Sequence, residues 1–270
     1  MIRIGQHTVV PVLDAVVRRD PFQLFRTSTE ASWEPHRDFL AADGRLELFL
    51  GGYVVQTGGR LVLIDTGVGP DGWNSPTGAK MPGGFLPYNL RVAGFEPEAF
   101  TDVICTHLHS DHIGWVSRDG EAVFANATYR CHRADWAYFL EESRDDVALK
   151  LLPPIASRFE MWDAETTLFP GFNVVPAPGH TPGSTIVVLS GDAGDRAMLL
   201  GDVVHCPVQL LDDEWGAVAD VDPALAAATR VRLNREVEGS NTLVGAAHFP
   251  GLQFGRVISG EPRRRWALAR

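Results

Sequence analysis

The sequence predicts an α/β protein in which two mixed β-sheets pack face to face and helices cover their outer faces. Two observations lead to this prediction: short apolar runs typical of strands alternate with helical patterns, and both kinds of element recur in each half of the chain. A third observation concerns domain organisation. No internal repeat, low-complexity tract or long linker interrupts the 270 residues, so we expect residues 1–270 to form a single domain.

The predicted strands are short and end at polar or glycine residues. Residues 46–55 and 61–64 flank Gly58 and Gly59, a pattern that predicts a β-hairpin. The apolar run at 103–106 is typical of a buried strand. The same pattern predicts further strands, at residues 173–177, 185–189, 197–201 and 242–246.

Helical patterns lie between these strands. They cover residues 133–142, 145–152 and 223–238. The last helix has the clearest start, because Asp222 can cap its N-terminus and Pro223 suits a first turn. Helices that alternate with groups of strands pack on the outer faces of the sheets, which completes the layered prediction.

The longest loop signal runs from Gly67 to Leu90. It contains many glycines and prolines, in Gly69-Pro70-Asp71-Gly72, Asn74-Ser75-Pro76 and Met81-Pro82-Gly83-Gly84. This composition disfavours both strand and helix. Loops of this length in compact domains often carry function. We therefore expect this segment to be a loop on the substrate side of the site.

Composition narrows the class of ligand. The chain carries 24 Lys and Arg against 34 Asp and Glu, a formal net charge of -10, which argues against nucleic acid or an anionic membrane as a partner. The N-terminus lacks the continuous apolar stretch of a signal peptide or membrane span, so we predict a cytoplasmic protein. The cysteines show no CxxC spacing, which predicts reduced thiols at Cys105, Cys131 and Cys206.

One short run concentrates potential metal ligands. It places four donors within six residues, directly after the predicted strand at 103–106: His107, His109, Asp111 and His112. A single histidine is more often a packing or surface residue, but four donors at this spacing predict a metal site. Imidazole and carboxylate donors together suit zinc, and also iron, manganese or cobalt, so zinc is the default.

Three more donors follow apolar runs elsewhere in the chain. His180 lies in the turn Pro178-Gly179-His180-Thr181-Pro182-Gly183, Asp202 follows Leu200-Gly201, and His248 follows Ala246-Ala247. Each could also occupy its turn or strand end for local reasons. Because a mononuclear catalytic site needs about three protein ligands, the combined set predicts two ions at one edge of the sheets.

These motifs together resemble the metallo-β-lactamase superfamily, whose HxHxDH motif is followed by a distal histidine, aspartate and histidine. The resemblance spans residues 65–248 and implies the αββα sandwich of that family. It implies that one zinc ion is held by His107, His109 and His180, and a second by Asp111, His112 and His248, with Asp202 bridging the two. Asp65, which ends its strand in Asp-Thr-Gly, matches a family aspartate that orients a ligand histidine.

A site with two ions predicts hydrolysis. Two adjacent divalent ions give a bridging hydroxide near neutral pH and polarise a carbonyl or phosphoryl oxygen. No side-chain nucleophile is then required, and the sequence contains no G-x-S-x-G elbow, Walker loop or strand-associated G-x-G-x-x-G motif. Asp111, besides being a ligand, is expected to accept or orient the proton of this hydroxide.

Residue types at two positions narrow the substrate. Class B1 β-lactamases have a cysteine ligand where this chain has Asp202, so they resemble it less. In acyl-homoserine lactonases of the superfamily a tyrosine follows the bridging aspartate by three positions, and here that residue is His205. An imidazole can donate to an oxyanion or protonate a leaving alkoxide, which predicts a catalytic role; packing at a strand end is the alternative. The Gly-Asp-x-x-His form is closer to methyl parathion hydrolase-like members.

Small lactones and small esters are therefore the predicted substrates. Aromatic residues near the motifs and in the long loop favour a neutral or partly apolar molecule, although each ring could instead anchor the core: Trp73, Phe85, Tyr88, Trp115, Phe249 and Phe254. Two other chemistries stay open, a persulfide dioxygenase with a single iron and a glyoxalase II-like thioester hydrolase. Apolar loop residues make a homodimer reasonable. Three histidines are expected to be structural or at the surface: His7, His36 and His132.

Overall fold

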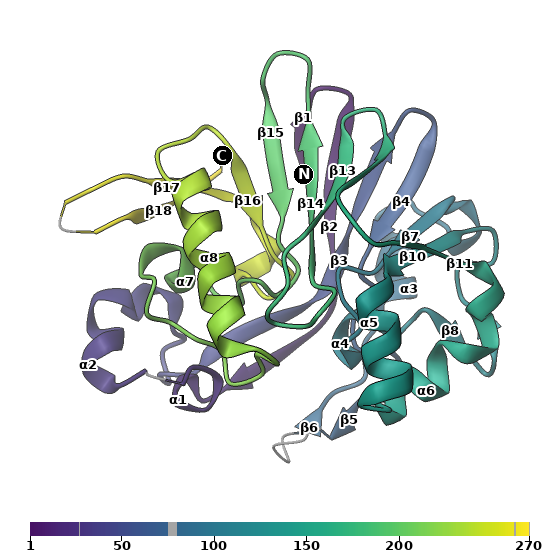
Figure 1. Ribbon diagram of the computed structural model, residues 1–270, viewed down its shortest axis with the longest axis horizontal. Coiled ribbons are helices and arrows are strands. Elements are labelled where there is room, and N and C mark those ends of the chain that lie inside the picture. The colour runs from purple at the N-terminus through teal and green to yellow at the C-terminus, as the bar shows by residue number, and fades with distance from the viewer. Residues whose placement is uncertain (27, 75–79, 262, 270) are drawn as a thin grey trace.

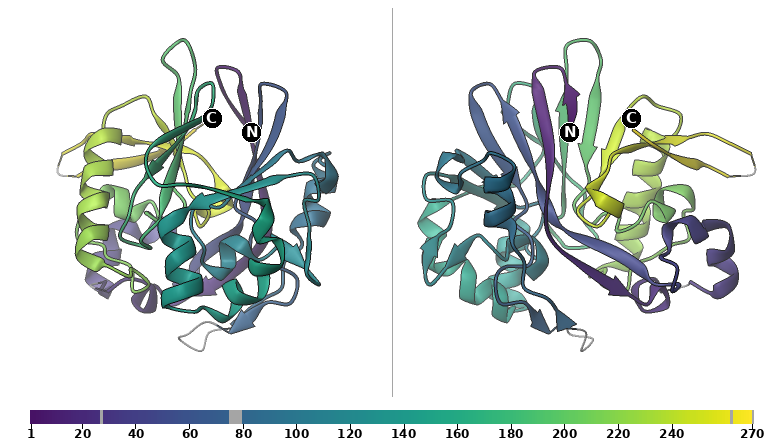
Figure 2. Two further views of the ribbon diagram at one scale, coloured as in Figure 1. Left: turned by 45° about the vertical axis from the view of Figure 1, so that its right-hand side comes forward. Right: turned by 180° about the vertical axis from the view of Figure 1, so that it is seen from behind.

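Two seven-stranded β-sheets form the centre of the molecule. The computed structural model describes residues 1–26, 28–74, 80–261 and 263–269. The sheets pack face to face, and helices cover their outer faces (Figure 1, Figure 2). The predicted layers are thus confirmed, whereas the single domain over residues 1–270 stays a prediction.

The first sheet has an antiparallel part and a parallel part. Its order is β1-β2-β3-β4-β7-β10-β11, with β1 to β4 antiparallel and β4, β7, β10 and β11 parallel. The strands are β1 (Ile2–Ile4), β2 (His7–Arg19), β3 (Leu46–Thr57), β4 (Arg60–Ile64), β7 (Asp102–Ile104), β10 (Thr128–His132) and β11 (Phe159–Trp162). Because β4 and β7 are parallel, the residues that follow them, Asp65 and the run from His107 to His112, leave the sheet at the same edge.

The second sheet is antiparallel except for one pair. Its order is β12-β13-β14-β15-β16-β17-β18, and β15 runs parallel to β16. The strands are β12 (Thr166–Phe169), β13 (Phe172–Pro176), β14 (Thr185–Ser190), β15 (Arg196–Leu199), β16 (Leu243–Gly245), β17 (Gly255–Ile258) and β18 (Arg265–Leu268). The parallel pair brings Asp202, after β15, and His248, after β16, to one edge of this sheet.

Short helices connect and cover the sheets. The α-helices are α1 (Pro21–Leu24), α2 (Glu30–Trp33), α3 (Leu86–Val92), α4 (Ser110–Ile113), α5 (Arg133–Ala137), α6 (Asp146–Leu151), α7 (Val208–Leu211) and α8 (Pro223–Val237). The 3-10 helices are η1 (Glu34–Phe39), η2 (Pro97–Ala99), η4 (Pro153–Arg158) and η5 (Pro250–Leu252), and η3 (Tyr138–Glu142) is π-helical. Two-residue strands pair as β5 (Trp73–Asn74) with β6 (Lys80–Met81), and β8 (Ser117–Arg118) with β9 (Glu121–Ala122).

The predicted helices form where expected. The capping prediction for α8 is confirmed, since the Asp222 side chain accepts a hydrogen bond from the amide of Leu225 and Pro223 occupies the first turn. Residues 133–142 form α5 followed directly by η3, and α6 begins after its cap Asp145. Among the described residues, no helix has both the length and the apolar character that a membrane span requires.

Three of the four apolar clusters among the described residues form layers between and outside the sheets. Between the sheets, Tyr53 and Ile64 of the first sheet belong to the same buried cluster as Val187 and Leu199 of the second. A second cluster joins the outer face of the first sheet to α3 and α6, and a third joins the second sheet to α8 through Leu233. Burial of each aliphatic side chain contributes roughly 1.5–3 kcal/mol to the free energy of folding. These layers therefore fix the position of the strand ends that carry the predicted metal ligands.

The predicted loop from Gly67 to Leu90 is wrong in part. Residues 75–79 lie outside the described residues, but on either side of them β5 pairs with β6, and α3 begins at Leu86. Pro87 favours the first turn of a helix, and Leu86 and Leu90 are buried one turn apart. A proline in this segment therefore begins a helix, although the proline content of the segment predicts a loop. The substrate-side role of the segment stays a prediction.

Three aromatic residues predicted for a pocket wall are buried instead. Trp115, Phe249 and Phe254 all lie in the apolar clusters, and the Trp115 indole donates a hydrogen bond to Asp14. All three side chains thus pack in the core, as the alternative expected, and their contact with a substrate stays a prediction. The three cysteines are free and buried, as predicted.

Candidate metal centre

Asp65 organises the edge where β4 and β7 end. Its backbone has a φ of 60°, a left-handed conformation that is uncommon outside glycine. The carboxylate accepts hydrogen bonds from the backbone amide and the hydroxyl of Thr106, each at 2.8 Å, and contacts Nδ1 of His112 at 2.9 Å. Backbone strain of this kind costs on the order of 1–3 kcal/mol and persists where surrounding contacts over-determine it. Asp65 thus lies against a predicted ligand histidine, as expected.

The donor run from His107 to His112 forms a turn and one short helix. The chain leaves β7, and His109 becomes the N-terminal cap residue of α4, which carries Asp111 and His112. The amide and hydroxyl of Thr66 both donate hydrogen bonds to the carbonyl of His112, at 2.7 and 3.0 Å. The Asp-Thr-Gly segment therefore holds the helix in place, and the donor side chains project over the edge of the sheet.

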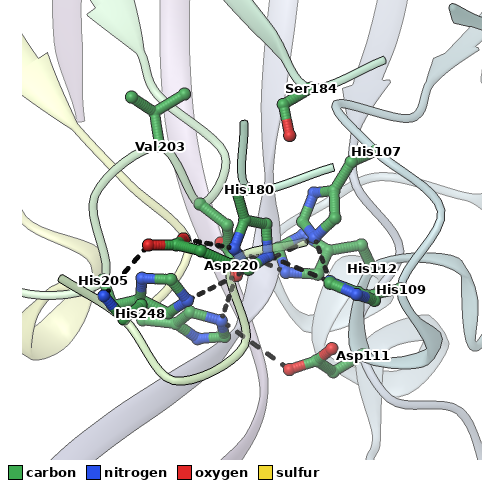
Figure 3. A network of polar contacts seen from close by, with 12 residues as sticks. His107, His109, Asp111, His112, His180, Ser184, Val203, His205, Asp220 and His248 are labelled. Carbon is green, nitrogen blue, oxygen red and sulfur yellow. Dashed lines mark hydrogen bonds and ion pairs between the residues drawn. The ribbon is translucent and has the colours of Figure 1, made fainter. Parts of the chain in front are cut away.

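Three ring nitrogens converge on one point. Nδ1 of His109 lies 3.0 Å from Nε2 of His107 and 3.0 Å from Nε2 of His180 (Figure 3). In a tetrahedral zinc site with bonds of about 2.0–2.1 Å, neighbouring nitrogens are about 3.3 Å apart. The three histidines that the family resemblance assigned to one ion thus have the spacing of a ligand set.

Asp202 lies between this group and a second one. Its Oδ2 is 3.8 Å from Nε2 of His107 and 3.1 Å from Nε2 of His248, and its Oδ1 is 3.3 Å from Nε2 of His112. Oδ2 of Asp111 lies 3.7 Å from the same His248 nitrogen. The structure therefore brings all seven predicted donors together, in the two groups of three joined by Asp202 that the sequence suggested.

The unpaired atoms of this cluster fit a divalent metal. Nε2 of His112 and Oδ1 of Asp202 are buried and have no hydrogen-bond partner among the described residues. Buried polar atoms are almost always paired, because an unpaired one costs about 1–3 kcal/mol. Nδ1 of His109 also faces Nε2 of His107 and Nε2 of His180, and a single proton on Nδ1 cannot form a hydrogen bond to both. A cation resolves each of these deficits, so the donor set fits a divalent metal cofactor.

Burial sets the ionisation of the donors. It lowers the pKa of His109 to about 3, with the charge of His180 adding to the effect, and it takes the pKa of His107 well below its ordinary value. Burial alone would raise the pKa of Asp202, but the surrounding histidines, His112 and His248 first, hold it well below its ordinary value. Burial alone would lower the pKa values of His112 and His248, but the carboxylate of Asp202 raises both above their ordinary value. His107 and His109 are therefore neutral, the form that binds a metal ion, whereas His112 and His248 would release a proton on binding one.

The segment that carries the seven donors matches a known family. The pattern of the family described as "Metallo-beta-lactamase superfamily" matches residues 52–248. The chain belongs to this superfamily. Its fold and its assignment as a hydrolase, both predicted from the resemblance, are confirmed.

Several relatives within the superfamily are lactonases. The N-acyl homoserine lactonase AiiA of Bacillus thuringiensis subsp. kurstaki is 23% identical over 208 residues, which cover 73% of this chain and 79% of AiiA. An N-acyl homoserine lactonase of Bacillus cereus is 24% identical over 194 residues, covering 67% and 74% of the two chains.

Solved structures show the same fold over nearly the whole chain. AidC, described as a dizinc quorum-quenching lactonase in complex with a product, superposes with a TM-score of 0.84 at 23% identity, covering 100% of this chain and 96% of its own. The hydrolase AbOPH of the β-lactamase superfamily gives a TM-score of 0.84 at 24% identity, with the same coverage. At these identities the similarity establishes the fold alone.

In this superfamily member, His205 lies against the centre of the donor cluster. Its Nε2 is 3.4 Å from Oδ2 of Asp202, and its ring stacks on that of His248 at 5.7 Å. The backbone amide of His205 donates to the side chain of Gln209, which in turn donates to the carbonyl of Trp215. Burial lowers the pKa of His205 to about 3, so the ring is neutral at physiological pH.

Sequence reasoning missed a buried ion pair behind His180. Oδ1 of Asp220 contacts Nδ1 of His180 at 3.2 Å, and its Oδ2 accepts a hydrogen bond from Nη2 of Arg230 at 2.8 Å. Asp220 precedes α8 and Arg230 lies within it, so the longest helix among the described residues contributes to holding a predicted ligand. A carboxylate on the second ring nitrogen fixes the tautomer of a ligand histidine and raises its basicity. The cap Asp222 and the following Pro223 marked the helix, but nothing marked this contact.

Replacement of Asp220 by asparagine is expected to weaken metal binding about 10- to 100-fold, the usual effect of losing a carboxylate behind a ligand histidine. Competition with a chromophoric chelator measures the affinity of each metal-binding event. Glu236→Gln, on the exposed side of α8, is the matched control and should leave metal affinity unchanged. Wild-type affinity in Asp220→Asn would show that the contact is not used to hold His180.

Proposed function

We propose that the protein is a binuclear zinc hydrolase that opens a small lactone or cleaves a small ester, with an N-acyl homoserine lactone as the first candidate. The position of Asp202 between two groups of three donors is the observation that carries this proposal. The lactonase relatives support the choice of substrate, and the dizinc description of AidC supports the choice of metal.

The proposed ligands divide as the geometry groups them. His107, His109 and His180 would hold one ion, Asp111, His112 and His248 the other, and Asp202 both. Zinc ions at these positions would supply a water of lowered pKa and a Lewis acid for the substrate carbonyl. Among the described residues the cluster contains no serine or cysteine at the position of a nucleophile, so water is the attacking group in this scheme.

We assign Asp111 as the residue that accepts the proton of the attacking water. Burial alone would raise its pKa, but the charges of His112 and His248 hold it below its ordinary value, so the carboxylate is ready to accept a proton. Its side chain is 18% exposed, whereas that of Asp202 is only 4% exposed. Asp111 therefore stands where water and substrate reach the cluster.

The accessible side of the cluster carries polar groups and one cation. His109 and Asp111 are partly exposed, and the Phe139 ring packs edge-on against His109 at 5.2 Å. Arg19 is half-buried nearby, and its positive charge interacts with Asp111. Phe139 is buried in the core behind His109, so Arg19 is the group on this side that would meet the carboxylate that ester hydrolysis produces.

His205 is expected to stabilise the oxyanion through its ring N–H, because the neutral ring that burial enforces donates a hydrogen bond without carrying a charge. His205→Phe keeps an aromatic ring against His248 but removes the donor, and kcat should fall by about two orders of magnitude. His205→Gln, which restores a donor, should recover part of this loss. Steady-state kinetics and metal content are measured together, since equal kcat in all three proteins would favour simple packing.

A hydrolysis panel on the zinc-reconstituted protein tests the proposed function. The panel comprises N-hexanoyl homoserine lactone, γ-caprolactone, phenyl acetate, paraoxon and nitrocefin, and we expect the highest kcat/KM on a lactone or the carboxylic ester. Glutathione persulfide with an oxygen electrode and S-lactoylglutathione represent the two alternative chemistries. Oxygen consumption with one bound iron, or turnover of the thioester alone, would overturn the proposal. The cytoplasmic location and the homodimer stay predictions.

A further inference from the structure

A cavity outside the donor cluster is lined by none of the seven proposed ligands. It has a volume of about 500 Å³ and is bounded by η1, by the segment after His248 and by the residues leading into β18. The hairpin of β17 and β18 extends from the second sheet on the side where α2 lies (Figure 1, Figure 2). The size of this cavity falls within the range of about 300–1,000 Å³ typical of ligand sites.

Three consecutive arginines line this cavity. Arg264 is already engaged, since its guanidinium donates to Asp213 at 2.6 Å and to the carbonyl of Leu211. Arg263 and Arg265 have no carboxylate partner within the described ranges 1–26, 28–74, 80–261 and 263–269. Asp38 contributes one opposing charge to the wall. In a chain with a net charge of -10, two unengaged guanidinium groups at one cavity mark a site for an anion.

His36 adds a buried polar group to the same wall. The residue is only 3% exposed, and its ring forms no hydrogen bond within the part of the chain that the structure describes. Its ring packs against Phe39 and Trp215, which fix its orientation. Burial and then the charge of Arg263 lower its pKa, so the ring is neutral and offers one N–H. An N–H on the cavity wall that has no protein partner is available to a ligand atom.

The remaining wall is apolar and aromatic. Phe39, Phe249 and Trp266 line the cavity, and the rings of Phe249 and Trp266 meet edge to face at 5.4 Å. Apolar walls with a few convergent polar groups are the usual composition of a small-molecule site. The planar guanidinium fork of arginine matches a carboxylate group. We propose that this cavity binds a small organic carboxylate, with its charge at Arg263 and Arg265 and its apolar body against Phe39 and Trp266.

Calorimetric titration of the zinc-loaded protein with 1-naphthoate tests this proposal. 1-Naphthamide has the same body without the charge, and acetate has the charge without the body. We expect 1-naphthoate to bind about tenfold or more tightly than either, because charge-assisted hydrogen bonds and apolar burial both contribute. Equal affinity for the acid and the amide would overturn the proposal.

Variants locate the binding. Arg263→Ala/Arg265→Ala should weaken 1-naphthoate binding about tenfold or more. Arg3→Ala/Arg45→Ala removes the same charge from exposed positions outside the cavity and should leave binding unchanged. The side chains of all four arginines are exposed. An unchanged melting temperature confirms that both variants are folded. Binding that survives loss of Arg263 and Arg265, or that disappears in His109→Ala, would place the carboxylate at the metal centre and refute the second site.

Discussion

Replacement of Asp202 by alanine is expected to lower kcat/KM by at least about three orders of magnitude, since it removes the residue on which both donor groups depend. Asp202 is the carboxylate between His107, His112 and His248, and its Oδ1 has no other partner among the described residues. Its loss leaves Asp111 as the single carboxylate among the seven proposed ligands. Metal content measured by plasma mass spectrometry should fall together with activity.

Three comparisons make the Asp202 result specific. Asp202→Asn keeps the size of the side chain but removes its charge, and should lose nearly as much activity. His109→Ala removes one donor of the first group and should also abolish metal-dependent turnover. Asp192→Ala, at an exposed turn, is the control for loss of an acidic residue. Circular dichroism should show all variants folded, and unchanged activity in Asp202→Ala would refute the two-metal proposal.

Replacement of Asp65 by asparagine is expected to lower the affinity of the second donor group for metal about 10- to 100-fold. Asparagine tolerates the left-handed backbone that this position requires, so the turn should be preserved. The amide, however, supplies one acceptor where the carboxylate receives contacts from Thr106 and from Nδ1 of His112 on two oxygens. His112 then loses the partner that fixes its tautomer. Chelator competition measures the affinity.

Asp65→Ala separates this positioning effect from backbone strain. Alanine lacks the hydrogen bonds that offset the φ of 60°, so this variant should also unfold at lower temperature, with a stability loss of roughly 1–3 kcal/mol. Asp65→Asn should show the affinity loss with a smaller change in melting temperature. If both variants bind metal as the wild type does, Asp65 does not position His112.

The donor positions could be predicted from the sequence because each follows an apolar strand. Parallel pairing of β4 with β7 and of β15 with β16 then carries Asp65, the His107 run, Asp202 and His248 to one edge. Strand ends and histidine spacing are local patterns, and local patterns are visible in a single sequence. The layered fold was predictable for the same reason.

Contacts made through space could not be predicted in this way. Asp220 lies 40 positions from His180, and only the approach of α8 to the edge of the sheet joins them. Asp14 is similar: it is buried, and its carboxylate accepts hydrogen bonds from the amides of Val68 and Leu86 and from the Trp115 indole. These bonds tie both ends of the segment expected to be a loop to β2.

Strand β2 was not predicted from the sequence, for a local reason. β2 pairs with β3 over most of its length, but the register shifts between Leu13 and Ala15, where Asp14 turns inward. This irregularity interrupts the alternation of apolar and polar residues that marks a strand. A bulge that serves a buried carboxylate thus hides the strand from pattern-based prediction.

The number of zinc ions bound per folded chain tests the central proposal most directly. Native mass spectrometry of the zinc-reconstituted protein, after removal of loosely bound metal, reports this number without reference to any substrate. We predict two ions per chain in the wild type, and at most one in His109→Ala and in Asp202→Ala. A wild-type protein that binds a single ion at saturation would contradict the two-metal centre.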